Sequence, residues 1–531
     1  MTAGRGEGGR VVVIGAGMGG LAAVLRLAHA GCAVTVLERA AGPGGKMRTL
    51  PSPAGPVDAG PTVMTMRWVF EALFAEVGER LEAHVGLHPE PLLARHWWRD
   101  GSTLDLFTDP EASAAAIRGF AGPRAEAEFR AFDAEAAALF AAFDAPMMRA
   151  GRPDLGRLAL AALARPRLWP ALGPFATLAR RLARQFTDPR LRQLFGRYAT
   201  YVGGAPHLSP AVLSLIWQAE ARGVWRVEGG MNRLARAMAA LAETKGARFR
   251  YGAPVARIEV QGGRAAAAVL ACGERIAADA IVFNGDPAAL ARGLMGPAAQ
   301  GAVPRRAVSP RSLSAHVWAF AARPAGRDLV HHNVFFGADP AREFGPIAAG
   351  RLPEDPTLYV CAQDRGTGQT PPAVERFEII MNAPPCAPGS ATEEDSPCRM
   401  PDYRELVFGG LARSGLTFAP SPPDAALTTP RGFETLFPGS DGSLYGRSPH
   451  GLTASLSRPT ACSSLPGLIL AGGGAHPGAG IPMATLSGRH AAAATLTSLA
   501  STSTSPRTAM PGGTSTQSRT TAPAPSPSSP S

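Results

Sequence analysis

Lysine is nearly absent from this sequence. Only Lys46 and Lys245 are lysines among 53 basic residues, so arginine carries almost all of the formal net charge of +11. A basic excess can indicate nucleic acid or an anionic membrane surface as a partner. Because the arginines are spread along the whole chain and no nucleic-acid-binding motif accompanies them, we expect no nucleic-acid partner. A coding bias that favours arginine is the alternative explanation of the charge.

Cysteine is also scarce. The six cysteines lie far apart, with no Cys-x-x-Cys spacing, which indicates free thiols in a reducing compartment. The polar N-terminus leads directly into a strand and leaves no room for a secretory signal, so we expect a cytoplasmic protein. Arg or Pro interrupts every apolar stretch before the roughly 18 residues that a membrane-spanning helix needs, which restricts any membrane contact to the periphery.

The length and composition are typical of a large globular protein. Of 531 residues, 45% are hydrophobic and 18% are charged, and a chain of this length usually forms two domains. Residues 10–40 predict a strand, a glycine turn, a helix and a second strand, which form one βαβ unit. Helix formers dominate from residue 69 to about residue 222, with clear helical stretches at 126–143 and 155–186. Short strand patterns follow between 249 and 283 and again between 313 and 381.

These patterns predict an α/β fold with a discontinuous Rossmann-type nucleotide-binding domain and a mixed α+β substrate domain. The expected division is a nucleotide-binding domain at 10–75, 226–305 and 461–499, a helical substrate region at 76–225, a substrate-domain sheet at 306–460 and a tail at 500–531. The tail consists mainly of Ser, Thr, Pro, Ala and Gly and lacks a hydrophobic period, so we expect it to be disordered.

The run Gly15-Ala16-Gly17-Met18-Gly19-Gly20 lies directly between the first predicted strand and the first predicted helix. Gly15 permits a tight turn, Gly17 lets the backbone approach a pyrophosphate, and Gly20 lets the helix and the strand pack closely. The N-terminus of the helix then attracts the phosphate charge. Glu38 ends the second strand, where its carboxylate is expected to bind a ribose hydroxyl and to disfavour the 2′-phosphate of NADP. These residues predict a bound dinucleotide, either NAD or FAD.

A second set of motifs favours FAD. Gly44-Gly45-Lys46-Met47-Arg48 forms another glycine turn that places a basic side chain near the phosphates, and Asp58-Ala59-Gly60-Pro61-Thr62 follows it. With these motifs the chain resembles the carotenoid desaturases of the phytoene desaturase type, within the larger group of amine-oxidase-like flavoproteins. The resemblance extends from Arg10 to about Leu499, and the run LAGGGAHPGAGIP that begins at Leu470 is similar to the C-terminal flavin motif of the family. The resemblance therefore implies FAD as the cofactor.

The glycine patterns and the resemblance together predict the residues that bind FAD. The glycines that follow Ala471 offer backbone N–H groups, and Gly480 precedes a predicted helix whose N-terminus suits the electron-rich edge of a flavin. In the family, the stretch that contains Pro61 and Thr62 lies near the flavin. The backbone of Val255 lies against the adenine in the family, and an ordinary strand residue is the alternative interpretation of Val255. The predicted cofactor-binding residues are Gly15, Ala16, Gly17, Gly20, Glu38, Gly45, Lys46, Pro61, Thr62, Val255, Gly473, Gly474, Gly480, Ile481 and Met483.

The resemblance implies a desaturase that removes a hydride and a proton from neighbouring carbons of a lipophilic carotenoid, with the flavin as hydride acceptor. The electrons would then pass to oxygen or to a quinone. The run from Pro482 to Arg489 is similar to the branch of the family that acts on hydroxylated acyclic carotenoids, which favours 3,4-desaturation of 1-hydroxyneurosporene in the spheroidene-type pathway of phototrophic bacteria. The alternatives are a phytoene desaturase, a carotenoid isomerase or ketolase, and a non-catalytic flavoprotein that binds carotenoid.

The sequence shows no acid–base dyad, and its candidates for catalysis are weak. His476 lies in the C-terminal motif, where it could serve as a general base or hold the loop by hydrogen bonding. Arg152 and Asp154 occupy roughly the place of an Arg-Asp element in bacterial relatives, and a solvated helix cap is the alternative.

We expect no metal site. His331 and His332 look like a metal-binding pair, but adjacent residues on a strand point to opposite faces of the sheet. The sequence also shows no cluster of Asp, Glu or Cys beside them to complete a ligand set.

The stretch 155–186 predicts a contact with a membrane. It combines Leu, Ala, Trp169 and Phe175 with six arginines, which is the composition of an interfacial helix pair. Such a surface would bring a cytoplasmic protein to a hydrocarbon dissolved in lipid, so we expect peripheral association with the inner, photosynthetic membrane. A solvated helical hairpin is the alternative.

Overall fold

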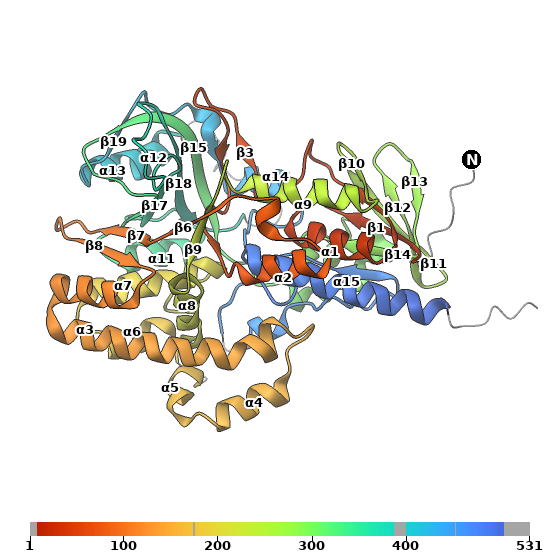
Figure 1. Cartoon of the computed structure of the whole chain (residues 1–531), viewed down its shortest axis with the longest axis horizontal. Coiled ribbons are helices and arrows are strands. Elements are labelled where there is room, and N and C mark those ends of the chain that lie inside the picture. Colours follow the sequence, from red (N-terminus) through yellow and green to blue (C-terminus); the bar gives the residue numbers. More distant parts are fainter. Residues whose placement is uncertain (1–7, 174–175, 387–399, 452, 504–531) are drawn as a thin grey trace, which may run out of the picture.

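The computed structural model describes residues 8–173, 176–386, 400–451 and 453–503. A five-stranded parallel sheet lies at one end of the long axis of the molecule, and an eight-stranded sheet lies at the other end (Figure 1). A group of helices packs beside the second sheet. This mixed α/β architecture confirms the predicted fold class.

The parallel sheet is assembled from three separate parts of the chain. Its order is β10 (Arg248–Arg250), β2 (Ala33–Leu37), β1 (Arg10–Ile14), β14 (Ala280–Phe283) and β21 (Leu468–Leu470), and every pairing is parallel. Its first face packs under α1 (Met18–His29), α9 (Asn232–Thr244) and α15 (Ile481–Ser503), and its second face packs against β11 (Val255–Gln261), β12 (Arg264–Leu270) and β13 (Arg275–Ala277). Side chains alternate between the faces, because Val11 and Val13 join the helical core while Val12 and Ile14 join the other core. The predicted strands between 249 and 283 are therefore confirmed.

The eight-stranded sheet is mainly antiparallel and has two different faces. Its strands are, in order, β19 (Thr417–Ala419), β15 (Ser314–Ala325), β18 (Glu375–Ala383), β17 (Leu358–Ala362), β16 (His332–Phe335), β7 (Leu92–Trp97) and β8 (Thr103–Phe107), with β20 (Leu427–Thr428) paired to β15. One face buries Trp318, Phe377 and Ile379 in an apolar core. The opposite face turns Ala319 toward Ala59, which belongs to the segment predicted to lie near the flavin.

The helical region differs from the sequence prediction in two respects. Strands β7 and β8 lie within residues 76–225, where we predicted mostly helix, and they extend the eight-stranded sheet. Their short apolar runs fit either a strand or a helix, and only pairing with β16 decides between them. In its described residues, the stretch 155–186 forms three helices and not one helix pair: α4 (Leu155–Leu163), α5 (Trp169–Leu172) and α6 (Leu178–Gln185). Phe175, which the sequence analysis counted in this stretch, lies outside the described residues. Pro166 begins a short 3-10 turn between α4 and α5 because proline cannot continue the hydrogen bonding of the preceding helix.

Two other predicted boundaries also differ from the structure. The predicted helix at 126–143 is the second half of α3 (Pro110–Phe143), which kinks at Gly122, where φ is 87°. Helix α15 reaches Ser503 and so includes the first four residues of the predicted tail, whereas residues 504–531 lie outside the described part of the chain. In the described residues, no helix has both the length and the apolar character needed to cross a membrane.

The remaining elements connect these layers. They are β3 (Thr49–Leu50), β4 (Val57–Asp58), β5 (Met64–Thr65), α2 (Trp68–Glu76), β6 (Leu87–Glu90), α7 (Pro189–Gly196), α8 (Ile216–Ala221), β9 (Val224–Val227), α10 (Pro287–Ala291), α11 (Pro340–Ala348), α12 (Met400–Arg404), α13 (Gly410–Arg413) and α14 (Pro430–Leu436).

Candidate cofactor and substrate site

The first glycine turn follows β1 at the carboxyl edge of the parallel sheet, the edge where such sheets bind dinucleotides. Gly15 has a φ of 97°, a left-handed conformation that glycine adopts without steric cost. A Cβ on Gly20 would lie 2.1 Å from the carbonyl oxygen of Gly15. Helix α1 can therefore approach β1 only with glycine at position 20, which is the close packing that the sequence predicts there.

Glycine turns from distant parts of the chain meet at this edge. Gly17 forms a bridge with Gly44, and a Cβ on Gly19 would lie 2.6 Å from the backbone nitrogen of Gly472. Asn284 holds these turns together, because its side-chain amide donates to the carbonyl of Gly15 over 3.1 Å. The sequence analysis missed Asn284, although its position directly after β14 was a signal that it lies at the carboxyl edge.

Glu38 lies at the end of β2 with only 6% of its surface exposed. Its carboxylate accepts one hydrogen bond from the backbone N–H of Ala16 over 2.7 Å and another from that of Ala40 over 2.8 Å. The N–H of Ala253 donates to its backbone carbonyl over 2.9 Å, which places the segment before Val255 beside the same strand end. The carboxylate thus shapes the glycine turn, and its remaining lone pairs are available to a ribose hydroxyl.

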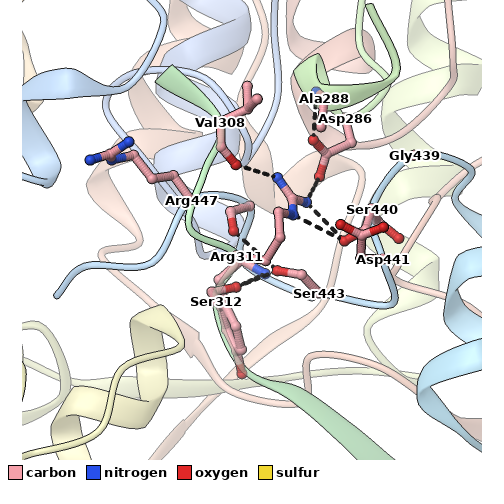
Figure 2. A network of polar contacts seen from close by, with 12 residues as sticks. Asp286, Ala288, Val308, Arg311, Ser312, Gly439, Ser440, Asp441, Ser443 and Arg447 are labelled. Atoms are coloured by element: carbon pink, nitrogen blue, oxygen red, sulfur yellow. Dashed lines mark hydrogen bonds and ion pairs between the residues drawn. The ribbon is translucent and has the colours of Figure 1, made fainter. Parts of the chain in front are cut away.

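A buried charge network joins the loop after β14 to the loop at 440–447 (Figure 2). Arg311 donates to the carboxylate of Asp286 and to the carbonyl oxygens of Val308 and Ser440. Lys46 also faces this network: its ammonium group donates to the carbonyl of Leu444 over 2.6 Å, and burial lowers its pKa to about 8, opposed by the charge of Asp286.

The same region carries a net positive charge. Arg458 is buried, donates to the carbonyl of Gly473 over 2.9 Å, and has a pKa lowered to about 10 by burial. Arg458, Arg311 and Lys46 all interact electrostatically with Asp286, so three cations surround one carboxylate. A positive excess at the cofactor edge suits phosphate groups or the electron-rich end of a flavin.

The C-terminal motif forms a second cradle beside the first. Gly472 and Gly480 have φ values of 101° and 100°, and Gly480 directly precedes α15. Ile481 is buried and Met483 is partly buried in the core under α1. The N-termini of α1 and α15 are therefore both presented near the glycine turns, where their N–H groups can bind negative charge.

The predicted flavin-proximal segment contacts the eight-stranded sheet. Thr62 follows Pro61 and shares a hydrogen bond of 2.8 Å with the hydroxyl of Tyr359 on β17. The Tyr359 hydroxyl also lies 2.7 Å from Nδ1 of His332 on β16. A cavity of about 260 Å³ lies beside this chain of contacts, and its lining includes Thr62, Asp58 and Cys361.

The three weak catalytic candidates do not form a site. Arg152 is exposed, and Asp154 caps α4 by accepting from the N–H of Arg157 over 3.0 Å, which favours the helix-cap interpretation. His476 is 1% exposed, and its Nε2 lies 2.9 Å from the carbonyl of Ala150. Burial lowers the pKa of His476 to about 4, so the ring is neutral near pH 7 and supports the loop-holding interpretation.

The reasoning against a metal pair at His331 and His332 was wrong. His331 lies just before β16, so strand alternation does not separate the two side chains, and β17 brings Cys361 beside them. One ligand atom from each of the three residues lies within 4.8 Å of the others, and Cys361 Sγ is 3.7 Å from His331 Nε2. The sequence could not show this cluster because strand register, not sequence spacing, forms it.

The cradle has the features that FAD requires. Glycines stand where a Cβ would fill the space at the turns, two helix N-termini face the same edge, and buried cations outnumber the nearby carboxylate. The residues predicted to bind the dinucleotide half, Gly15, Ala16, Gly17, Gly20 and Glu38, lie together, as do Gly473, Gly474, Gly480 and Ile481 in the second cradle. Their individual contacts with the cofactor stay predictions.

Comparison with known proteins agrees with this geometry. Residues 18–318 match the family described as flavin containing amine oxidoreductase. The chain is 62% identical over 494 residues to a hydroxyneurosporene desaturase from Cereibacter sphaeroides. The matched region covers 93% of this chain and 99% of that protein. It is 55% identical to a hydroxyneurosporene desaturase from Rhodobacter capsulatus, with coverage of 92% and 97%.

A solved structure supports the fold alone. Cyclohexylamine oxidase from Brevibacterium oxydans has a TM-score of 0.54 and 18% sequence identity, with coverage of 93% of this chain and 99% of that chain. Since the matching family contains flavin and the cradle is built for a dinucleotide, FAD is the cofactor, as predicted. The chain belongs to the flavin-containing amine oxidoreductases, in the group that includes the hydroxyneurosporene desaturases.

Proposed function

We propose that this protein is an FAD-dependent carotenoid desaturase that introduces the 3,4 double bond into 1-hydroxyneurosporene. The observation that carries this proposal is the 62% identity, over nearly the whole of both chains, to a protein named hydroxyneurosporene desaturase. The glycine cradles, and the lack of an acid–base dyad among the predicted site residues, agree with hydride transfer to a flavin.

The protein itself positions the substrate and excludes water from the reacting atoms. When bound, FAD provides the hydride acceptor for the reaction. On the sheet face that is turned toward the flavin-proximal segment, Ala319 packs against Ala59, and Val317 and Ile380 pack with Phe433. Apolar walls exclude water, and the polyene delocalises the positive charge that hydride loss creates.

Substrate choice tests the proposal. FAD-loaded enzyme receives phytoene or 1-hydroxyneurosporene in liposomes, with quinone in one series and oxygen in another. We expect conversion of 1-hydroxyneurosporene alone, with a red shift from one added conjugated double bond. Conversion of phytoene through several steps would place the protein with the phytoene desaturases. Conversion of neither substrate would favour an isomerase, a ketolase or a carotenoid-binding role. The acceptor that gives the higher conversion rate, quinone or oxygen, identifies where the electrons go.

We further propose that α4 and α5 attach the protein peripherally to the membrane that dissolves its substrate. These helices project from the helical region away from both sheets (Figure 1). No residue of α4 is buried, and its Leu155, Leu160 and Leu163 are 62%, 66% and 68% exposed, with Trp169 of α5 54% exposed. Arginines between these positions would add attraction to anionic lipid.

Liposome sedimentation tests this contact. The double variant Leu160→Ser and Leu163→Ser should sediment less with anionic liposomes than the parent protein, and high salt should release part of the parent protein because salt screens the arginines. Leu436→Ser is the matched control, because Leu436 is also exposed, at 39%, but lies on α14. Equal sedimentation of all three proteins would show that α4 does not bind the membrane.

A further inference from the structure

A row of polar side chains crosses the face of the eight-stranded sheet that is turned toward the flavin-proximal segment. Strand register makes Glu378 on β18 the neighbour of Ala319 on one side and of Cys361 on the other, and Cys361 is the neighbour of His332. Cross-strand neighbours point to the same face, so these side chains share the face of Ala319, which packs against Ala59. The polar row thus faces the segment that runs to Thr62.

Glu378 is the unusual member of this row. Its side chain is 0% exposed, and neither carboxylate oxygen has a hydrogen-bond partner among the described residues. Burial and the charge of Asp58 raise its pKa well above the ordinary value, whereas the charge of Arg48 and the nearby backbone N–H of Gly60 and side chain of Thr62 oppose the rise. A buried carboxyl group without a partner is costly to the fold, so its retention calls for a functional reason.

Glu375 on the same strand shows the contrast. It is also buried, at 3% exposure, but its two oxygens accept hydrogen bonds of 2.7 and 2.9 Å from Arg365. Strand β18 therefore holds one buried glutamate that is fully paired within the fold and another that is not. The carboxyl group of Glu378 has acceptor capacity left, and the cavity of about 260 Å³ reaches its row at Cys361 and Thr62.

Neutral polar side chains lie beside the Glu378 carboxyl group, in addition to the charges of Asp58 and Arg48. Burial lowers the pKa of His332 well below its ordinary value, so its ring is neutral and one nitrogen donates while the other accepts. The Tyr359 hydroxyl bridges His332 and Thr62. Apolar positions flank this cluster in the next row of the sheet, where Ile380 pairs with Tyr359 and with Val317. The polar row is thus bounded by apolar side chains on one flank and by Arg376 on the other.

We propose that this polar row binds the hydroxyl end of the carotenoid substrate, with Glu378 accepting the hydrogen bond of the substrate hydroxyl and Tyr359 completing the pocket. The inference rests on the proposed 3,4-desaturation. In that reaction the hydroxyl-bearing carbon is two bonds from the nearer reacting carbon, so its binding site must lie beside the flavin. The row meets this requirement because Tyr359 contacts Thr62 directly.

The site also explains discrimination. A carotenoid without a hydroxyl would leave the Glu378 carboxyl group unpaired against hydrocarbon, and an unpaired buried polar group rejects the wrong substrate strongly.

The test compares Glu378→Met with Glu375→Met in the FAD-loaded enzyme, using 1-hydroxyneurosporene and neurosporene as substrates. We expect Glu378→Met to lower the ratio of kcat/KM for the two substrates by about tenfold or more, mainly through loss of activity on the hydroxylated one. Its thermal midpoint should not fall, because methionine removes a buried unpaired carboxyl group. Glu375→Met should lower the thermal midpoint, since it removes two buried hydrogen bonds from Arg365, without changing the ratio. Tyr359→Phe should lower the ratio in the same direction.

Three results would overturn the proposal. An unchanged substrate ratio in Glu378→Met and Tyr359→Phe would show that the row does not recognise the hydroxyl. An equal fall of kcat for both substrates would make Glu378 a proton acceptor instead. If the parent enzyme converts neither substrate, the proposed function fails, and equilibrium binding of the two carotenoids to the FAD-loaded protein then decides this inference separately. Tighter binding of the hydroxylated carotenoid that Glu378→Met abolishes would support the row, and equal binding of both would refute it.

Discussion

Replacing Glu38 by alanine should weaken the fold as well as the binding of FAD. The carboxylate accepts from the N–H of Ala16, which is buried, and from that of Ala40, which solvent can reach. A hydrogen bond to a charged group contributes about 1.5–3 kcal/mol when buried and less when water can replace it, so the loss of both should cost roughly 2–4 kcal/mol. This is a large share of the typical stability of about 5–15 kcal/mol. Glu38→Gln keeps one acceptor oxygen and should lose about half as much.

Thermal unfolding at several FAD concentrations separates the two effects. Ligand that binds only the folded protein stabilises it in proportion to the logarithm of its concentration, so a lower FAD affinity changes how the midpoint depends on FAD. The lost backbone hydrogen bonds lower the midpoint at every FAD concentration. If Glu38→Ala and the parent protein unfold at the same midpoint when extrapolated to low FAD, the carboxylate serves the ribose alone and the structural argument is wrong. Glu71→Gln, at an exposed surface ion pair, is the control that should leave both quantities unchanged.

Further outcomes follow from the site. Gly20→Ala should yield protein without the flavin absorbance band, because its Cβ would lie 2.1 Å from the Gly15 carbonyl oxygen; a normal FAD content would contradict this. His476 has a lowered pKa in the fold, so its contribution to stability is present above pH 6.5 and is lost as the pH falls toward 4; His476→Gln should flatten the decrease in thermal midpoint over that range, and an unchanged profile would refute it. Burial alone would raise the pKa of Asp286, but Arg311 lowers it overall, so Asp286 stabilises the fold above its unfolded pKa of 3.8. Asp286→Asn should therefore lower the urea midpoint at pH 7 more than at pH 3, and equal losses at both pH values would exclude the ion pair as the cause.

The parts of the fold that the sequence predicted well are those whose signals are local. The strand, glycine turn and helix at the start of the chain occupy consecutive residues, and each element has a propensity of its own. The strands β11, β12 and β14 were equally visible because turns with glycine separate them. Strands β7 and β8 were missed because helix-forming sequence surrounds them and their strand character comes from pairing with β16. Pairing between distant segments leaves little trace in the local sequence.

The residues of the candidate site also fall into those that the sequence could predict and those that it could not. The glycines of both cradles could be predicted because a tight turn or a close backbone approach requires that residue type at that place. Asn284, Arg311 and Arg458 could not, because asparagine and arginine occur in many contexts and their partners lie in other parts of the chain. The argument that no cysteine accompanies His331 and His332 was wrong for a related reason, since Cys361 is on another strand.

The sequence by itself determined the dinucleotide cradle and its position at the end of a strand, because backbone geometry and helix N-termini act over a few consecutive residues. The resemblance of its motifs also determined the family. Only the tertiary structure decided which side chains share the sheet face that is turned toward the flavin-proximal segment. Glu378, Cys361 and His332 come from three strands, and antiparallel register brings them into one row. A shift of one residue in any of these strands would turn its member of the row to the other face, and no local pattern in the sequence specifies that register.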